Sequence, residues 1–104
     1  MKIFIDEKLT SEIKDNVIDF GIVAAGSPKK FIFYVFNNSE AELDDLKFDV
    51  EQNITEREIK ILEAPVIIRA NSVGKLVIEV NPSITLKQGI KAQLRITGVE
   101  LWSY

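Results

Sequence analysis

The sequence contains no cysteine and no histidine. Without cysteine, the chain has neither disulfide bonds nor thiolate ligands for zinc. Without histidine, it lacks the side chain that most often acts as a general base or binds a metal ion. Catalysis would then depend on other groups, and no convergent pair of carboxylates stands out. We therefore predict a protein that is not an enzyme and that uses no cofactor and no metal.

The sequence also lacks an excess of positive charge and any long apolar run. Its formal net charge is −3, whereas a surface that follows phosphates carries an excess of lysine and arginine. A membrane-spanning helix needs about 20 consecutive apolar residues, and no stretch approaches that length. Charge at Lys2, Asp6 and Glu7 comes too early for a signal peptide. Neither nucleic acid nor a membrane is a predicted partner, and the protein is expected inside a cell or in a particle assembled there.

The residues that are present describe one folded domain. A chain of 104 residues can form one hydrophobic core but not two. Hydrophobic residues make up 46% of it and charged residues 28%, which excludes a disordered chain of low hydrophobicity and high net charge. We predict a single domain over residues 1–104.

Alternation of apolar and polar residues, the pattern of a half-buried β-strand, recurs along the chain between turn residues. It predicts that Ile3 and Ile5 share one side of the first strand. No helical stripe interrupts the series. Strands are predicted at residues 2–6, 17–21, 31–37, 46–51, 59–61, 76–80 and 90–96. Together they indicate an all-β, antiparallel immunoglobulin-like β-sandwich of about seven strands.

The segment at residues 31–37 is apolar on both of its faces. We expect the odd positions, among them Phe33, to face the core. The even positions then need a second cover, which is either residues 2–6 of the same chain or a partner protein. These even positions are the first candidate interface: Ile32, Tyr34 and Phe36.

The C-terminal segment at residues 99–104 is the second candidate interface. Tryptophan and tyrosine are enriched in interface hot spots because they bury a large area at a small cost in entropy. We expect Val99 and Leu101 to face inward, while Trp102 and Tyr104 face a neighbouring molecule. The alternative is that Leu101 and Trp102 complete the last strand and cap the core of the domain. The interface residues predicted here are Leu101, Trp102 and Tyr104.

Three other patterns have simpler explanations. Asp44-Asp45, Asp49 and Glu51 form an acidic cluster in which Asp49 and Glu51 share a strand face; this would allow a weak cation site, but a solvated acidic face is the favoured interpretation. The letters of Asp19-Phe20-Gly21 match a kinase motif, yet the rest of that machinery is missing, so a strand end that enters a turn is expected. Residues 26–30 contain a proline and precede a strand, which favours a turn over a phosphate-binding loop.

A series of short motifs resembles a known group of domains. The first is Ile18-Asp19-Phe20-Gly21-x-Val23-x-x-Gly26, followed by Val35-Phe36-Asn37-Asn38-Ser39 and then by Leu76-Val77-Ile78-Glu79-Val80-Asn81-Pro82. Their order is similar to that in the immunoglobulin-like domains of the ASH and major-sperm-protein group, over about Val17 to Thr97. The resemblance implies an immunoglobulin-like fold and a non-enzymatic scaffold that binds other proteins.

Two further considerations lead to a predicted role. The ASH-type domains usually lie within long chains, whereas free-standing immunoglobulin-like proteins are typical accessory parts of bacteriophage particles. We therefore predict a virion accessory protein, in capsid decoration or at the head or tail, whose partners are viral structural proteins or copies of itself. One alternative is a cytoplasmic adaptor that binds a peptide or protein by strand addition. Another is a carbohydrate-binding module. No small-molecule substrate is expected.

Overall fold

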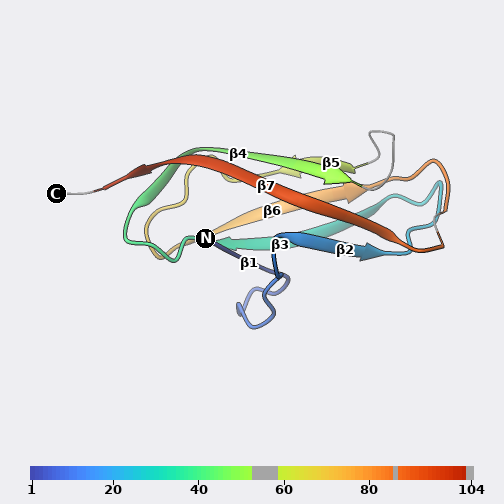
Figure 1. Cartoon of the computed structure of the whole chain (residues 1–104), viewed down its shortest axis with the longest axis horizontal. Helices are drawn as coiled ribbons and strands as arrows, with labels where there is room; N and C mark the ends of the chain where they lie inside the picture. The colour runs from blue at the N-terminus through green and yellow to red at the C-terminus, as the bar shows by residue number, and fades with distance from the viewer. Residues whose placement is uncertain (53–58, 86, 103–104) are drawn as a thin grey trace.

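The chain forms two antiparallel β-sheets. The structure, a computed structural model, describes residues 1–52, 59–85 and 87–102. Its strands are β1 (Lys2–Phe4), β2 (Val17–Gly21), β3 (Lys29–Phe36), β4 (Glu42–Gln52), β5 (Ile59–Glu63), β6 (Val73–Val80) and β7 (Ile90–Leu101). One sheet has the order β1-β3-β6-β5 and the other β2-β7-β4 (Figure 1). The described residues form no helix, and hence none that could cross a membrane. The all-β, antiparallel sandwich predicted from the sequence is confirmed.

The strand order follows that of an immunoglobulin constant domain in one sheet and departs from it in the other. An immunoglobulin sandwich has sheets of strands A-B-E-D and C-F-G. If β1, β3, β6 and β5 are taken as A, B, E and D, the four-stranded sheet has the same order. In the second sheet β4 and β7 take the places of C and F. The place of G, beside F, is filled by β2 from the N-terminal part of the chain.

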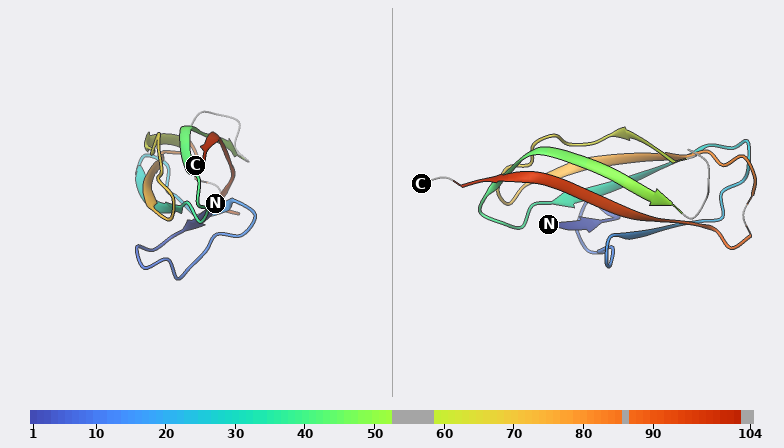
Figure 2. Two further views of the ribbon diagram at one scale, coloured as in Figure 1. Left: turned by 90° about the vertical axis from the view of Figure 1, so that its left-hand side faces the viewer. Right: turned by 45° about the horizontal axis from the view of Figure 1, so that its top comes forward.

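The N-terminal segment supplies an edge strand to both sheets. First, β1 pairs with β3 from Lys2↔Phe36 to Phe4↔Tyr34. The chain then makes an excursion through residues 5–16, which projects from the sandwich (Figure 2). Beyond it, β2 joins β7 in the other sheet. Because β1 has only three residues and β2 only five, each covers part of the much longer strand beside it.

The excursion is held by hydrogen bonds at its base and at its turn. The N–H of Ile13 donates to the carbonyl oxygen of Ile3 at 2.8 Å. The carboxylate of Asp6 accepts from the N–H of Thr10 at 3.0 Å and from the N–H of Ser11 at 2.9 Å. The hydroxyl of Thr10 and these backbone donors lower the pKa of Asp6. The chain therefore leaves the sheet after Phe4, and Ile5 is 57% exposed. The prediction that Ile5 shares the buried side of Ile3 is wrong.

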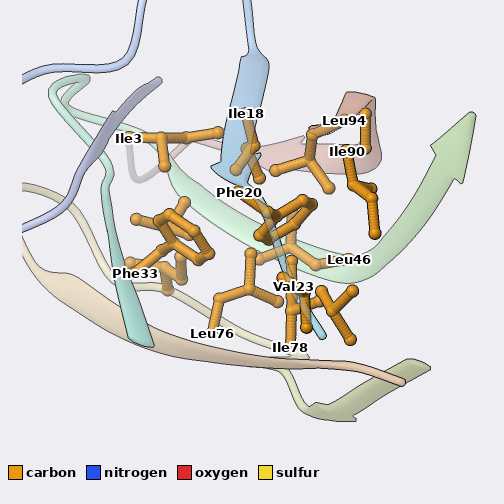
Figure 3. Packing of buried hydrophobic residues seen from close by; sticks show 14 of the residues in the cluster. Ile3, Ile18, Phe20, Val23, Phe33, Leu46, Leu76, Ile78, Ile90 and Leu94 are labelled. Atoms are coloured by element: carbon orange, nitrogen blue, oxygen red, sulfur yellow. The ribbon is translucent and has the colours of Figure 1, made fainter. Parts of the chain in front are cut away.

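The core lies between the sheets and follows the predicted alternation. On β3, the side chains of Phe33 and Val35 are buried, as expected for the odd positions. The ring of Phe20 packs edge-on against Phe31, with ring centroids 4.9 Å apart, and against Phe33 at 6.3 Å. Figure 3 shows Phe20 and Phe33 among aliphatic side chains from both sheets. The buried aliphatic residues of this cluster are Ile3, Ile18, Val23, Val35, Leu43, Leu46, Ile68, Leu76, Ile78, Val80, Ile90, Ala92 and Leu94.

The outer face of β3 is not covered in the way the sequence suggested. One of the two covers expected for the side chains at the even positions of β3 was residues 2–6. Instead β1 lies edge to edge with β3 in the same sheet. As a result Ile32 remains 44% exposed, and Tyr34 and Phe36 are half-buried. The free edge of β3 offers backbone hydrogen-bonding groups, and the N-terminal strand β1 pairs with them.

Asn37, the residue after β3, is a buried polar side chain that fastens one end of the sandwich. Its Nδ2 donates to the carbonyl oxygens of Ala41 at 2.7 Å, Ile68 at 3.1 Å and Arg69 at 3.2 Å. Its Oδ1 accepts from the N–H and the hydroxyl of Ser39 at 3.1 and 2.9 Å. One side chain thus connects the turn before β4 to the segment before β6.

Replacing Asn37 by alanine should lower the free energy of unfolding by about 2–3 kcal/mol, because buried carbonyl oxygens lose their donor. Asn37→Asp should cost more, since a carboxylate would face those oxygens. The adjacent Asn38 is exposed, so Asn38→Ala serves as the matched control with a change under about 0.5 kcal/mol. Urea denaturation followed by circular dichroism measures all three. Equal losses at the two positions would contradict the role of Asn37.

Candidate functional site

The C-terminal half of β7 has an edge without a partner strand. β7 pairs with β4 along its length, from Gln52↔Ala92 to Glu42↔Leu101. On its other side it pairs with β2 only between Ile90 and Gln93. The last bond on that side joins the N–H of Leu94 to the carbonyl oxygen of Asn16 at 2.8 Å. Within the described part of the chain, nothing pairs with this side of residues 95–101, which we call the open edge of β7.

Backbone polar groups of three residues point to this open edge. In an antiparallel strand, the N–H and C=O of successive residues point alternately to the two neighbouring strands. Since the N–H of Leu94 points toward the β2 side, those of Ile96, Gly98 and Glu100 point the same way. An unpaired row of this kind is a template for another strand.

The side chains beside the open edge are apolar and exposed. Val99 is 51% exposed, Leu101 46% and Trp102 53%. The prediction that Val99 and Leu101 face inward is wrong. The core-facing positions of β7 are the even ones, from Ile90 to Ile96, so the odd positions lie on the outer face. The predicted interface residues Leu101 and Trp102 are thus both available, and neither caps the core. Tyr104 lies outside the described residues.

The core ends at Gly98, which explains why Glu100, at the next core-facing position, is exposed. A Cβ atom at Gly98 would lie 2.8 Å from Cδ2 of Leu46. The buried side chain of Leu46 therefore occupies the space that a residue at position 98 would need. It reaches this place through a bulge in β4, where Asp44 pairs with Val99 and Lys47 with Thr97. The C-terminal end of β7 projects at this end of the molecule (Figure 1).

Carboxylates accompany the exposed apolar residues on the outer face. Glu42 is paired with Leu101 and Asp44 with Val99. A side-chain hydrogen bond with Asp44, then partial desolvation and the charge of Asp44, raise the pKa of Glu42, while Arg69 opposes the shift. The Oδ1 atom of Asp44 is buried and has no hydrogen-bond partner in the structure. This end of the molecule therefore holds negative charge that is only partly compensated.

The opposite edge of β4 is closed at this end. Leu43 exchanges two backbone hydrogen bonds with Ile68, each of 2.9 Å, and the N–H of Leu46 donates to the carbonyl oxygen of Val66 at 2.9 Å. The side chains of Val66 and Ile67 are 62% and 54% exposed. A strand that joins this end of the sheet must therefore pair with β7, and apolar surface is present on both sides of the β4–β7 pair.

The other predicted interface lies on the four-stranded sheet. Cross-strand neighbours place Val77 beside Ile32, Lys75 beside Tyr34 and Val73 beside Phe36. Ile32 also lines an open cavity of about 340 Å³, between β2, β3 and the excursion. The residues that line it are Ile5, Ile13, Val17, Ile18, Asp19, Phe31, Ile32 and Phe33. The interface at Ile32, Tyr34 and Phe36 stays a prediction.

The acidic strand face at Asp49 and Glu51 is accounted for by a basic neighbour. Arg95 lies opposite Asp49 in the register and forms an ion pair with Glu51. Among the described residues, no group of three acidic side chains could hold a metal ion. Asp19, of the Asp19-Phe20-Gly21 motif, accepts a hydrogen bond from the N–H of Gly21 at 2.9 Å, as expected for a strand end that enters a turn.

Comparison of the chain with protein-family models, curated proteins and solved structures found no match. The resemblance to the ASH and major-sperm-protein group therefore remains a prediction that rests on its motifs. The function is argued below from the open edge of β7 and the residues beside it.

Exposed and buried apolar residues of β7 should respond differently to the same substitution. The double change Val99→Ser and Leu101→Ser should lower the free energy of unfolding by about 1–2 kcal/mol in total, because only about half of each side chain is covered. Leu94→Ser on the same strand should cost about 3 kcal/mol or more, since Leu94 is 1% exposed. Chemical denaturation compares them. A large loss from the double change would place Val99 and Leu101 in the core.

Glu42→Gln should raise Tm at neutral pH. The pKa of Glu42 is raised in the folded state, so its protonation favours folding at low pH, and this contribution is lost as the pH rises through the folded-state pKa. A neutral amide retains a hydrogen bond to Asp44 at every pH. The gain in Tm should therefore shrink below the ordinary glutamate pKa of 4.5. Thermal melts across this pH range test the sign, and a gain that grows at low pH would contradict it.

Proposed function

We propose that this chain is a protein-binding module that accepts an extended strand of a partner protein along the open edge of β7. One observation carries the proposal: among the described residues, no strand pairs with the backbone groups of Ile96, Gly98 and Glu100, and exposed apolar side chains flank them. Strand addition uses such an edge, with main-chain hydrogen bonds for affinity and alternate side chains for specificity.

Both parts of the site contribute to binding. Each backbone hydrogen bond formed at Ile96, Gly98 or Glu100 contributes about 0.5–1.5 kcal/mol. Covering the exposed remainder of Val99, Leu101 and Trp102 contributes about 1 kcal/mol for each side chain. Because ordering the partner strand opposes these gains, the contact depends on the apolar side chains as well as on the edge.

The residues along the open edge favour a role in binding over an edge that is built only to avoid aggregation. Edges that only avoid aggregation carry lysine, proline or very short strands. Here the free part of β7 is long and regular, and Val99 and Leu101 place apolar surface beside it. Trp102 adds the residue type most enriched in hot spots.

A carbohydrate platform receives less support from the geometry. Stacking on a sugar would need exposed aromatic rings that share a plane. Tyr34 belongs to the four-stranded sheet, whereas Trp102 follows the last strand of the other sheet. The predicted setting of the module, in a bacteriophage virion or in the cytoplasm, stays a prediction, as does the absence of catalysis.

A neutral probe peptide tests strand addition directly. We expect a peptide of alternating valine and threonine to shift the backbone amide resonances of Ile96, Gly98 and Glu100. Emission from Trp102, the single tryptophan of the chain, should move to shorter wavelength as the ring becomes covered.

Glu100→Pro should abolish both signals, because proline removes an edge donor and its ring blocks the approach of a strand. The N–H that it deletes bonds to no other strand, so circular dichroism should show an intact fold. Glu100→Gln keeps the backbone donor and should retain binding of the neutral peptide. Unchanged binding by the folded proline variant, or amide shifts confined to another strand, would overturn the proposal.

A further inference from the structure

The end of the open edge near Val99 and Leu101 is acidic, whereas the basic residues Lys47, opposite Thr97, and Arg95 lie further back along the strand pair. Glu42, Asp44 and Asp45 lie on β4 beside the end of β7, and Glu100 lies on the edge itself. Arg69 is the cation that acts on Glu42. The side-chain Nε1 of Trp102 donates to Oε2 of Glu100 at 3.3 Å, which leaves the charge of that carboxylate uncompensated.

We propose that the strand accepted by β7 is basic, with lysine or arginine alternating with apolar residues. The inference rests on the function proposed above and adds the chemistry of the partner. The favoured position for a cation is opposite Val99 or Leu101, on the outer face of the sheet. Its aliphatic stem lies over these apolar side chains, and its charged end reaches Glu42 and Asp44.

The spacing of strands in a sheet accounts for the length of side chain required. Neighbouring strands lie about 4.8 Å apart, so β4 is two spacings, or about 10 Å, from a strand added to β7. Only a long side chain approaches Glu42 and Asp44 over that distance. Lysine and arginine combine a long apolar stem with a terminal charge, and they commonly place the stem on apolar surface.

The state of the two carboxylates in the free protein supports a cationic partner. Glu42 and Asp44 share a hydrogen bond, and their proximity raises the pKa of Glu42. A lysine or arginine head would supply the donors and the positive charge that this pair lacks.

A second copy of the chain is a poorer occupant, for a reason of symmetry. In antiparallel pairing about a two-fold axis, opposed residues lie on the same face, and the axis keeps each residue on its own face. Only residues of equal parity in the sequence can then oppose one another. Arg95 is at an odd position and Glu100 at an even one. In such a dimer Arg95 of one copy can therefore never lie opposite Glu100 of the other. Arg95 of a second copy could lie opposite Val99 or Leu101, but it already forms an ion pair with Glu51 and would have to give up that pair to reach Glu42 and Asp44.

Three short peptides of equal length test the charge preference: valine alternating with lysine, with threonine or with glutamate. Emission from Trp102 and the amide shifts of Ile96, Gly98 and Glu100 report binding. We expect the lysine peptide to bind at least about tenfold more tightly than the threonine peptide, and the glutamate peptide to bind most weakly. The advantage of lysine should fall as salt rises.

The variant Glu42→Gln tests whether the preference for the lysine peptide comes from the carboxylates on the outer face. It should reduce the affinity for the lysine peptide by about threefold or more and leave that for the threonine peptide unchanged. Because this variant is expected to be more stable than the parent, weaker binding cannot come from unfolding. The matched control is Glu63→Gln, an exposed glutamate on β5 in the other sheet, which should change neither affinity.

The outcomes separate this inference from the function on which it rests. Equal binding of all three peptides, abolished by Glu100→Pro, would retain strand addition and overturn the basic partner. A lysine preference that Glu42→Gln leaves intact would overturn the assigned carboxylates. Loss of binding by every peptide, or binding that the folded Glu100→Pro variant retains, would overturn the proposed function itself.

Discussion

The structure depends on the short length of the two N-terminal strands, β1 and β2. One segment must close the same side of both sheets, and it is too short to do so fully. β1 satisfies the edge of β3 next to Tyr34 and Phe36, and β2 satisfies the edge of β7 as far as Leu94. Each sheet consequently keeps part of one edge unpaired. The proposed binding site is the unpaired part on β7, and the cavity beside Ile32 lies where the chain crosses between the sheets.

The end of the sandwich that carries the site is held by a polar interaction inside the core. Asn37 joins the turn before β4 to the segment that covers the other edge of β4. With that edge paired, only the β7 side of the sheet remains free at this end. Leu46 fills the space at Gly98 and closes the core. A rigid support of this kind suits strand addition, because a template that is already ordered loses little entropy when a partner binds.

Local periodicity was enough to predict the fold class, the central strands and most of the core. Alternation at Leu76, Ile78 and Val80, and from Ile90 to Ile96, depends only on near neighbours, and the structure confirms it. The predictions that depend on how distant segments pair were less successful, such as the cover expected over β3 from residues 2–6. Val99 and Leu101 were expected to face inward, but they are out of phase with Ile90 to Ile96, and the alternation of β7 continues to the end of the strand and places them on the outer face. Leu101 and Trp102 were nevertheless named as binding candidates, whereas Glu42 was missed and Asp44 was taken only as part of an acidic cluster, because nothing local places either carboxylate beside β7.

The bulge in β4 controls which way the acidic side chains point. Leu43 and Leu46 are both buried although they are three positions apart, and the extra residue between them lets the strand change phase. Asp45, with a φ of 52°, adopts the left-handed conformation that such an insertion requires. If the strand were straightened with every residue kept, strict alternation from Leu46 would turn Leu43 outward and Glu42 and Asp44 toward the interior. Loss of Asp45 would instead remove the extra residue and leave Leu43, Leu46 and both carboxylates on their present faces. The bulge therefore lets a buried leucine on each side of it coexist with an acidic outer face, and a one-residue deletion here should be tolerated better than a one-residue insertion.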